Sequence, residues 1–292
     1  MGGMAAPPPA VIRAALALHL DPARLRPLGG ASAATWDIGD QVLRVGPRDR
    51  MGIELAAAAA AGAVLPVPAV LDRAEVQGEL AVLLERLPGR PAVEVALRDF
   101  GLARAVGLAC ASVHEALADV PAPASVPTVA EPRTVPRPPA ALMGRPRPRL
   151  LHLDLHPFNL LVSDDGRLTG VLDWANAAAG HPDLDRARTW SILTLDPAAR
   201  AGHSVPAFAA LADGWLESGQ LSQTPPAARA WACRYMLNDL GRRYSAEDLA
   251  PVHEAYEGLR HRTASTQPVG AIGPAGWCGG LSIPSAFGTA VA

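Results

Sequence analysis

The sequence predicts an α+β protein with two lobes, a small β-rich lobe followed by a larger helical lobe. Three observations lead to this prediction. Residues 1–87 contain short strand patterns around one prominent helix pattern. Apolar residues at helical spacing dominate the chain from residue 98 to residue 262. Two short apolar strands, joined by a turn at residues 163–166, interrupt the helical part and carry polar residues at their ends.

The predicted small lobe, residues 1–87, begins with a helix over residues 10–20. Two strands follow in LRPLGGASAATWDIGDQVLRVG, where Gly39-Asp40 is a hairpin signal. The run GIELAAAAAAGAV predicts a helix that Gly62 and two nearby prolines end. A second strand pair turns near Gln77-Gly78. These elements predict a small sheet accompanied by one prominent helix.

The predicted large lobe, residues 88–262, is mainly helical. A helix is expected over residues 98–120, and three further helix patterns lie within residues 206–262. Between them, residues 121–149 carry nine prolines, which predict an extended, polyproline-like segment. The tail from residue 263 is rich in Gly, Pro and Ser and lacks periodicity, so we expect residues 263–292 to be flexible.

Composition excludes several classes of function. The chain has 292 residues and a formal net charge of −2, which does not suggest the clustered basic face of a nucleic-acid-binding protein. It contains no lysine, so all 26 basic residues are arginines. Three widely spaced cysteines form no CxxC pair and favour a reducing compartment. No secretory signal or membrane-spanning run is visible, so we expect a cytoplasmic protein with no nucleic-acid or membrane partner.

The stretch LHLDLHPFNLLV, residues 151–162, places polar residues among apolar ones. Asp154 and Asn159 lie five residues apart, and Asp173 follows Asn159 by fourteen residues at the end of the second apolar strand. An acid and an amide on one loop, with an acid on the neighbouring strand, suit phosphoryl transfer. One carboxylate accepts the proton of the attacking hydroxyl, while the amide oxygen and the second carboxylate hold Mg²⁺ against nucleotide phosphates.

The combined pattern HLDLHPFNLLV…GVLDW…GHPDLDRAR resembles the aminoglycoside phosphotransferase-like family of small-molecule kinases. The resemblance implies a protein-kinase-like fold. By position, Asp154 resembles the catalytic base, and Asn159 and Asp173 resemble the Mg²⁺ ligands. Asp185 resembles the family's structural acid, and His152 the residue that supports the catalytic loop. The implied reaction moves the γ-phosphoryl group of ATP or GTP to a hydroxyl of a small molecule, such as an aminoglycoside antibiotic.

The small lobe carries matching features. Arg44 in QVLRVGP and Glu54 in GIELAAAA resemble the family's basic residue and its acidic partner on the following helix. The stretch VLLERLPG resembles the hinge whose backbone groups bind adenine, between Glu85 and Leu87. Small residues let backbone N–H groups approach phosphates. The candidates for the loop over the phosphates are Gly29, Gly30, Ala31 and Ser32.

Several features depart from the family pattern. Leu153 stands where the family usually has Gly and Phe158 where a small residue is common, and both are expected to enlarge the loop. Arg44 stands where Lys is expected, and the planar fork of arginine is not equivalent to the point charge of lysine. The segment before the catalytic loop is short and Pro-rich where the family often places substrate-shaping helices. These departures favour an alternative, a nucleotide-binding pseudokinase with little or no transfer activity.

A further alternative is a metallohydrolase. The spacing of His152, Asp154 and His156 places all three on one face of a strand, and zinc takes His and carboxylate ligands. The only other nearby cluster is His181 with Asp183. His114 follows a helical apolar stripe, so we expect it to be a packing residue.

The sequence leaves the phosphoryl acceptor open. Aminoglycosides usually demand a markedly acidic pocket. The acids of the last helices are nearly balanced by arginines, so we expect them to form a solvated face. Macrolides, other antibiotics, amino alcohols and sugars are equally open as acceptors.

Overall fold

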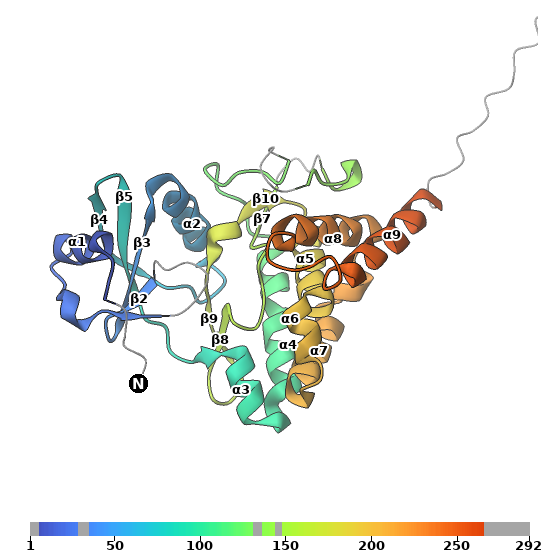
Figure 1. Cartoon of the computed structure of the whole chain (residues 1–292), viewed down its shortest axis with the longest axis horizontal. Helices are drawn as coiled ribbons and strands as arrows, with labels where there is room; N and C mark the ends of the chain where they lie inside the picture. Colours follow the sequence, from blue (N-terminus) through green and yellow to red (C-terminus); the bar gives the residue numbers. More distant parts are fainter. Residues whose placement is uncertain (1–5, 29–34, 131–135, 144–147, 266–292) are drawn as a thin grey trace, which may run out of the picture.

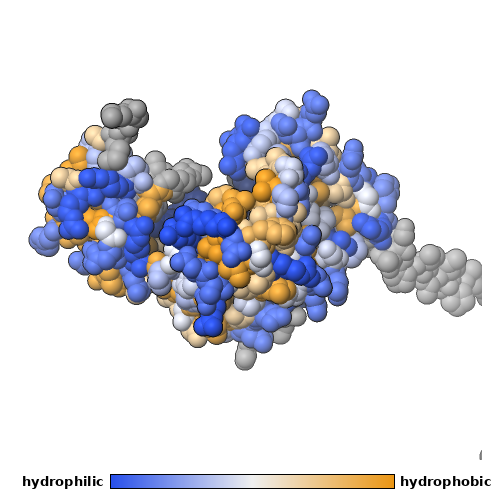
Figure 2. All heavy atoms as spheres, turned by 90° about the horizontal axis from the view of Figure 1, so that it is seen from below, coloured by the Kyte–Doolittle hydropathy of each residue, from blue (hydrophilic) through white to orange (hydrophobic). Residues whose placement is uncertain are grey.

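The computed structural model describes residues 6–28, 35–130, 136–143 and 148–265. They form a sheet-rich N-terminal part and a helical C-terminal part, which lie side by side in Figure 1. The surface view in Figure 2 shows a notch in the outline between the two parts. The predicted α+β fold, with a smaller β-rich part followed by a larger helical part, is confirmed.

The N-terminal part is built on a five-stranded antiparallel sheet of strand order β1-β2-β3-β5-β4. Gln77 and Gly78 connect β4 to β5. Both residues have positive φ, as a type I′ hairpin turn requires. The predicted hairpin is therefore present. The strands are β1 (Arg26–Pro27), β2 (Thr35–Asp37), β3 (Gln41–Pro47), β4 (Val70–Val76) and β5 (Glu79–Glu85).

Two helices accompany this sheet. α1 (Pro9–Ala17) starts at a proline, which is favoured at a first helical position, and its apolar face shares a core with Trp36 and Leu43 of the sheet. α2 (Arg48–Ala61) instead contributes Ala57 to the main core of the C-terminal part. α2 therefore joins the two parts through this shared core.

The C-terminal part contains more helices than the sequence predicted. The helix expected over residues 98–120 is preceded by a separate one, which the sequence reading missed. Asp99 divides them, because its extended backbone ends the first helix and its side chain accepts a hydrogen bond from the Gly101 N–H at the start of the second. The helices are α3 (Ala92–Arg98), α4 (Phe100–Leu117), α5 (Pro182–Leu195), α6 (Pro197–Gly202), α7 (Pro206–Ser218), α8 (Pro226–Leu240) and α9 (Ala250–Ser265).

Two small sheets lie among these helices. β7 (Arg149–Leu151) pairs with β10 (Ala178–Gly180), and β8 (Leu160–Val162) pairs with both β6 (Arg90–Pro91) and β9 (Leu168–Val171). The predicted turn at residues 163–166 connects β8 to β9. Both sheets bring strand ends to the region between the two parts of the molecule (Figure 1).

Residues 127–129 of the Pro-rich segment run beside β10. The Val129 N–H donates to the Ala179 carbonyl at 3.1 Å, and η2 (Ala140–Leu142) is a single turn of 3₁₀ helix. At the other end of the chain, α9 extends beyond the predicted start of the tail at residue 263, and residues 266–292 lie outside the described residues. The predicted lobe boundary at residue 87 stays a prediction.

None of the helices within the described ranges is long and apolar enough to cross a membrane.

Candidate functional site

The predicted catalytic loop, residues 152–159, connects β7 to β8 and is held by a buried acid. Asp185, in the first turn of α5, accepts hydrogen bonds from the backbone N–H groups of His152 and Leu153 at 3.1 and 2.6 Å. Its other oxygen lies 3.5 Å from Nδ1 of His114 on α4. Burial opposes ionisation of this carboxyl, but His114 and the hydrogen bond from the Leu153 N–H outweigh it and keep the pKa of Asp185 below its ordinary value.

His152 connects the loop to the end of the neighbouring strand. Its Nδ1 accepts a hydrogen bond from the Asp154 N–H at 3.3 Å, and its Nε2 lies 2.9 Å from the carbonyl of Leu172. Because Nδ1 accepts, Nε2 carries the ring proton and donates it to Leu172. The fully buried ring also packs against Trp174, with ring centroids 4.7 Å apart. This geometry suits the loop-supporting role implied for His152.

Leu153 has positive φ, +62°, although it is not glycine. Its side chain is only 2% exposed and packs in a cluster with Leu184 and Trp231. The expectation that Leu153 enlarges the loop is therefore wrong, because the side chain fills the core beneath the loop. Phe158, by contrast, is 62% exposed and meets the His156 ring edge-on, with centroids 6.1 Å apart.

The carboxylate of Asp154 is about one quarter exposed, and one of its oxygens is occupied. Asn176 donates its side-chain N–H to Oδ2 of Asp154 at 3.2 Å, and Nε2 of His156 lies 4.0 Å from the same oxygen. Burial lowers the pKa of His156, although the charge of Asp154 opposes this shift. Since the donors engage Oδ2, Oδ1 is left to accept a proton from an incoming hydroxyl. The sequence reading missed Asn176, which lies in the 3₁₀ turn η3 (Trp174–Asn176) directly after Asp173.

Asn159 and Asp173 lie together because β8 and β9 are paired. The Leu172 N–H donates to the backbone carbonyl of Asn159 at 2.8 Å, which brings Asp173 beside the amide. The Asn159 side-chain N–H donates to the Asp154 carbonyl at 3.0 Å, so the side-chain oxygen of Asn159 points away from that carbonyl. Oδ1 of Asp173 is buried without a hydrogen-bond partner in the described chain. Two available oxygens of this kind fit Mg²⁺, which prefers hard oxygen ligands and keeps several waters.

Arg44 links the N-terminal sheet to this pair. From β3, its Nη1 forms an ion pair with Oε1 of Glu54 on α2, and its Nη2 lies 3.8 Å from Oδ1 of Asp173. Burial raises the pKa of Glu54; the charge of Arg44 opposes this shift and that of Asp173 adds to it. The structure thus brings Arg44 and Glu54 together as predicted. It also places the Arg44 guanidinium beside Asp173, the predicted Mg²⁺ ligand.

The predicted hinge follows the end of β5. The Glu85 N–H donates to the Ala69 carbonyl at 2.9 Å, whereas the Leu87 N–H has no hydrogen-bond acceptor within the described ranges. Gly89 is required just beyond, because it has φ of +104° and a Cβ there would lie 2.6 Å from the Val162 carbonyl oxygen. The predicted phosphate loop, Gly29, Gly30, Ala31 and Ser32, lies outside the described residues.

The metallohydrolase alternative finds no support in the described residues. They contain no group of three or more His, Cys, Asp or Glu side chains placed to hold a metal ion. Both ring nitrogens of His152 are engaged, and Nδ1 of His181 caps α5 by accepting the Asp183 N–H at 3.2 Å. The three-residue cluster of His152, Asp154 and His156 is therefore not a metal site in this fold.

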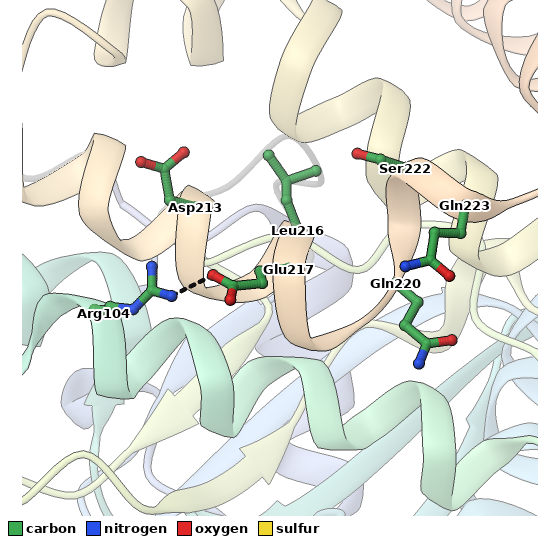
Figure 3. Close-up of a pocket in the computed structure, with 7 residues that line it drawn as sticks. All are labelled: Arg104, Asp213, Leu216, Glu217, Gln220, Ser222 and Gln223. Atoms are coloured by element: carbon green, nitrogen blue, oxygen red, sulfur yellow. Dashed lines mark hydrogen bonds and ion pairs between the residues drawn. The ribbon is translucent and has the colours of Figure 1, made fainter.

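An open pocket of about 450 Å³ lies elsewhere on the C-terminal part (Figure 3). Arg104 of α4 reaches across it to form an ion pair with Glu217 of α7. Arg104 precedes His114 by ten residues of the same helix, which corresponds to about 15 Å. No residue of the predicted site lines this pocket, whose lining comprises Arg104, Asp213, Leu216, Glu217, Gln220, Ser222 and Gln223.

Comparison with known proteins places this geometry in a family. Residues 24–145 and 130–231 match the model of the phosphotransferase enzyme family. The chain belongs to this family. The matched region includes the catalytic loop, Asp173 and α5, so the pattern at residues 152–188 and the family model point to the same segment.

Solved structures of phosphotransferases share the fold. Aminoglycoside phosphotransferase APH(2'')-Ib, bound to ADP, is 14% identical with a TM-score of 0.54, over 86% of this chain and 99% of that one. The APH(2'')-IIa ternary complex with streptomycin and ATP is 14% identical with a TM-score of 0.51, over 86% and 95%. A thermostable mutant of APH(4)-Ia, with AMP-PNP and hygromycin B, is 20% identical with a TM-score of 0.50, over 80% and 90%. The predicted protein-kinase-like fold is confirmed.

A match to a curated protein is short. The uncharacterized protein YcbJ of Bacillus subtilis (strain 168) is 47% identical to this phosphotransferase over 36 residues, which is 12% of each chain. This similarity therefore concerns one segment and not the whole protein.

Proposed function

We propose that this phosphotransferase uses Mg²⁺ and ATP or GTP to phosphorylate a hydroxyl of a small molecule. Membership of the phosphotransferase enzyme family supports a small-molecule phosphotransferase in general. The observation that carries the specific proposal is the Asp154 carboxylate, which Asn176 holds at one oxygen. Asn159 of the same loop donates to the Asp154 carbonyl, and Oδ1 of Asp173 has no hydrogen-bond partner among the described residues. A base and two hard oxygen ligands are the parts that phosphoryl transfer requires.

In the proposed reaction, Oδ1 of Asp154 accepts the proton of the acceptor hydroxyl. The acceptor oxygen forms a bond to the γ-phosphorus, and the bond from this phosphorus to the β,γ-bridging oxygen breaks to release the nucleoside diphosphate. Asn159 and Asp173 would hold Mg²⁺, which when bound neutralises charge on the phosphates. Arg44, oriented by Glu54, would bind the α- and β-phosphates.

Further support comes from the hinge and from the solved relatives. The Leu87 N–H, which has no acceptor among the described residues, offers a donor for the adenine or guanine ring, close to Glu85. Relatives of the same fold have been solved with ADP, AMP-PNP or ATP, and with aminoglycosides. We propose nucleotide use on these grounds, with an antibiotic such as an aminoglycoside among the acceptors to be tested. The cytoplasmic location predicted from the cysteine content also stays a proposal.

The test compares wild type with Asp154→Asn in a nucleotide-hydrolysis assay in which water replaces the acceptor. We expect slow release of diphosphate that needs Mg²⁺ and falls at least 10-fold in the variant, because the general base contributes on the order of 10²–10⁴-fold. The contact of Arg44 with Asp173 is the observation that supports the pseudokinase alternative, because it places a guanidinium beside the carboxylate that is proposed to bind Mg²⁺. Equal background rates in both proteins, with nucleotide binding intact, would establish that alternative.

A further inference from the structure

The catalytic loop, residues 152–159, has a buried face and an accessible face that alternate along the sequence. The residues at every second position from 153 are buried, namely Leu153, Leu155 and Pro157. The residues between and after them are accessible: Asp154 and His156 in part, and Phe158 to 62%. Asp154, His156 and Phe158 therefore share the accessible face of the loop, and Asp154 stands first among them.

Contacts join these three side chains into one row. Nε2 of His156 lies 4.0 Å from Oδ2 of Asp154. The ring of Phe158 meets the His156 ring edge-on, with centroids 6.1 Å apart, and the Phe158 N–H donates to Nδ1 of His156 at 3.3 Å. A molecule whose hydroxyl lies at Asp154 therefore has His156, and then Phe158, as the next side chains along this face.

His156 offers a polar group in the middle of the row. Because its Nδ1 accepts the Phe158 N–H, its Nε2 carries the ring proton. The 4.0 Å separation from Asp154 exceeds hydrogen-bond distance, and Nε2 has no hydrogen-bond acceptor within the described residues. About one quarter of the side chain is exposed. This N–H can therefore donate to an oxygen of a bound molecule.

The backbone that carries Phe158 is fixed on both sides. The Val93 N–H of α3 donates to the Pro157 carbonyl at 3.3 Å, and the Asn159 N–H donates to the His156 carbonyl at 2.9 Å. The Phe158 ring belongs to none of the apolar clusters that the described residues form. Aromatic rings beside a few fixed polar groups are typical of small-molecule sites. The ring is thus held in place by the loop and is available to a ligand.

We propose that the row of Asp154, His156 and Phe158 binds the phosphoryl acceptor, and that this acceptor is an amphiphilic hydroxyl compound whose apolar face packs on Phe158. The inference rests on the proposed function, because it takes Asp154 as the base. An apolar or aromatic face on the acceptor removes itself and the ring from water together. A uniformly polar polyol gains no such burial. Phe158 is therefore a specificity residue.

The first experiment identifies the acceptor class. Wild-type protein with MgATP is offered three matched pairs: phenyl glucoside with glucose, phenyl galactoside with galactose, and 3-phenoxypropane-1,2-diol with glycerol. The aminoglycosides hygromycin B and streptomycin are added as polar polycations. Mass spectrometry detects phosphorylated product, and a coupled assay measures release of ADP.

We expect the kcat/KM of an amphiphilic compound to exceed that of its polar partner at least about 3-fold, as for packing on one aromatic ring. A smaller ratio in all three pairs would overturn the inference. The absence of product from every amphiphilic compound, or an aminoglycoside as the best acceptor, would overturn it as well.

The second experiment tests Phe158 with the matched pair that gives the largest ratio. We expect Phe158→Ala to bring the ratio of kcat/KM values close to one and to change the KM for MgATP by less than about 2-fold. Phe158→Tyr keeps the ring and should keep the preference. A preference that survives in Phe158→Ala refutes the role of Phe158. A rise in the KM for MgATP, with the acceptor constants unchanged, assigns the ring to the nucleotide and refutes it too.

The matched control is Phe100→Ala. Phe100 is equally exposed, at 63%, but it is the first residue of α4 and lies outside the catalytic loop. This variant should keep the wild-type ratio, and an equal fall in it would refute the assignment to Phe158. The melting temperature of each variant checks the fold, which loss of an exposed ring should leave intact.

The two levels of proposal fail in different ways. Failure of the proposed function would appear as absent Mg²⁺-dependent nucleotide binding, or as hydrolysis that is insensitive to Asp154→Asn. Failure of this inference alone would leave both of these intact and would show no preference for the amphiphilic member of any pair.

Discussion

The carboxylate of Asp154, the proposed general base, is oriented by the side-chain amide of Asn176 at 3.2 Å. We predict that Asn176→Ala lowers kcat of the phosphotransfer by roughly 10- to 100-fold, because a carboxylate misplaced by about 1 Å can cost 10²-fold in rate. The KM for nucleotide should change little, since Asn176 contacts neither Arg44 nor Glu54. Steady-state kinetics measures both constants, and the melting temperature checks that the fold is intact. A kcat equal to that of wild type would remove Asn176 from the site.

Arg44 stands at a position where a lysine was expected, and its fork makes two contacts at once. Nη1 pairs with Glu54 and Nη2 approaches Asp173 at 3.8 Å. An ammonium cannot reproduce that planar geometry. We predict that Arg44→Lys keeps part of the nucleotide affinity and loses up to about 10-fold, whereas Arg44→Gln, which lacks the charge, loses more. Calorimetric titration with MgATP measures the dissociation constants. Binding that is tighter in Arg44→Lys than in wild type would contradict the argument.

At Leu153, the cost of a left-handed backbone conformation opposes the stabilisation from burying the side chain. The sizes of these two free energies decide which effect is larger. A left-handed non-glycine residue costs about 1–2 kcal/mol, while removal of a buried leucine side chain costs about 2–5 kcal/mol. Both Leu153→Ala and Leu153→Gly should therefore lower the free energy of unfolding. Because glycine alone relieves the backbone, we predict that Leu153→Gly is the more stable of the two variants, by about 1 kcal/mol.

The control for this prediction is Leu151, which is equally buried but lies in β7 with ordinary strand backbone. There the order should reverse, with Leu151→Ala more stable than Leu151→Gly. Urea unfolding of the four variants measures the order. The same order at both positions would show that the positive φ of Leu153 carries no energetic cost.

At the scale of elements, α5 and the catalytic loop are joined through Asp185. Asp185→Asn removes a charged acceptor of two buried N–H groups, and hydrogen bonds to charged groups contribute about 1.5–3 kcal/mol each. We predict a loss of about 2–4 kcal/mol in the free energy of unfolding at pH 7. Asp183→Asn changes the same chemistry in the same helical turn, but Asp183 is partly exposed, so it should cost less than about 1 kcal/mol.

The pH dependence of this difference has a definite sign. The folded-state pKa of Asp185 lies below its ordinary value, so its stabilisation is present above the unfolded-state pKa of about 3.9. It is lost as the pH falls through the lower folded-state pKa. The stability difference between wild type and Asp185→Asn should therefore shrink below about pH 4. A difference that grows on acidification would mean that Asp185 is not ionised in the folded protein.

Local signals explain which elements the sequence predicted. The helices with strong apolar periodicity and the β4–β5 hairpin with its Gln77-Gly78 turn were predicted because their causes lie within a few residues. α3 was missed because the residue that separates it from α4, Asp99, acts through one side-chain cap. The Pro-rich segment gave no sign that it would lie beside β10, since that contact joins residues fifty positions apart.

The residues of the candidate site also divide into those that a local sequence signal predicted and those that it did not. Asp154, Asn159 and Asp173 were predicted because a spacing motif in one short segment carries them. Asn176 follows Asp173 closely but belongs to no motif. The pairing of His114 with Asp185, and of Arg188 with Tyr235, joins helices that are distant in the sequence. Tertiary packing alone creates these contacts, so no local sequence pattern predicts them.

At the scale of the whole molecule, the proposed nucleotide site draws on both parts of the fold. Arg44 belongs to the sheet-rich part and Leu87 follows its last strand. Asn159 directly precedes β8 and Asp173 follows β9, in the helical part. α2 carries Glu54 and also packs into the main core with Val171 and Trp174. The two parts therefore share a core, and we expect them to unfold together.

This coupling predicts how ligand binding changes stability. A ligand at 100 times its dissociation constant stabilises the folded state by about 2.7 kcal/mol, so saturating MgATP should raise a single melting transition by several degrees. Chelation of Mg²⁺ with EDTA should remove most of that rise. Asp173→Asn should remove the Mg²⁺-dependent part as well, because it deletes one of the two proposed ligands.

The control for this last prediction is Asp164→Asn, which changes an exposed acid in the β8–β9 turn and should leave the MgATP shift intact. Differential scanning calorimetry with and without MgATP measures the number of transitions as well as their positions. Two transitions, of which MgATP moves only one, would mean that the parts unfold independently despite the core they share through α2. A shift that persists in Asp173→Asn would place the metal elsewhere, and then the buried Oδ1 of Asp173 would serve Arg44 alone.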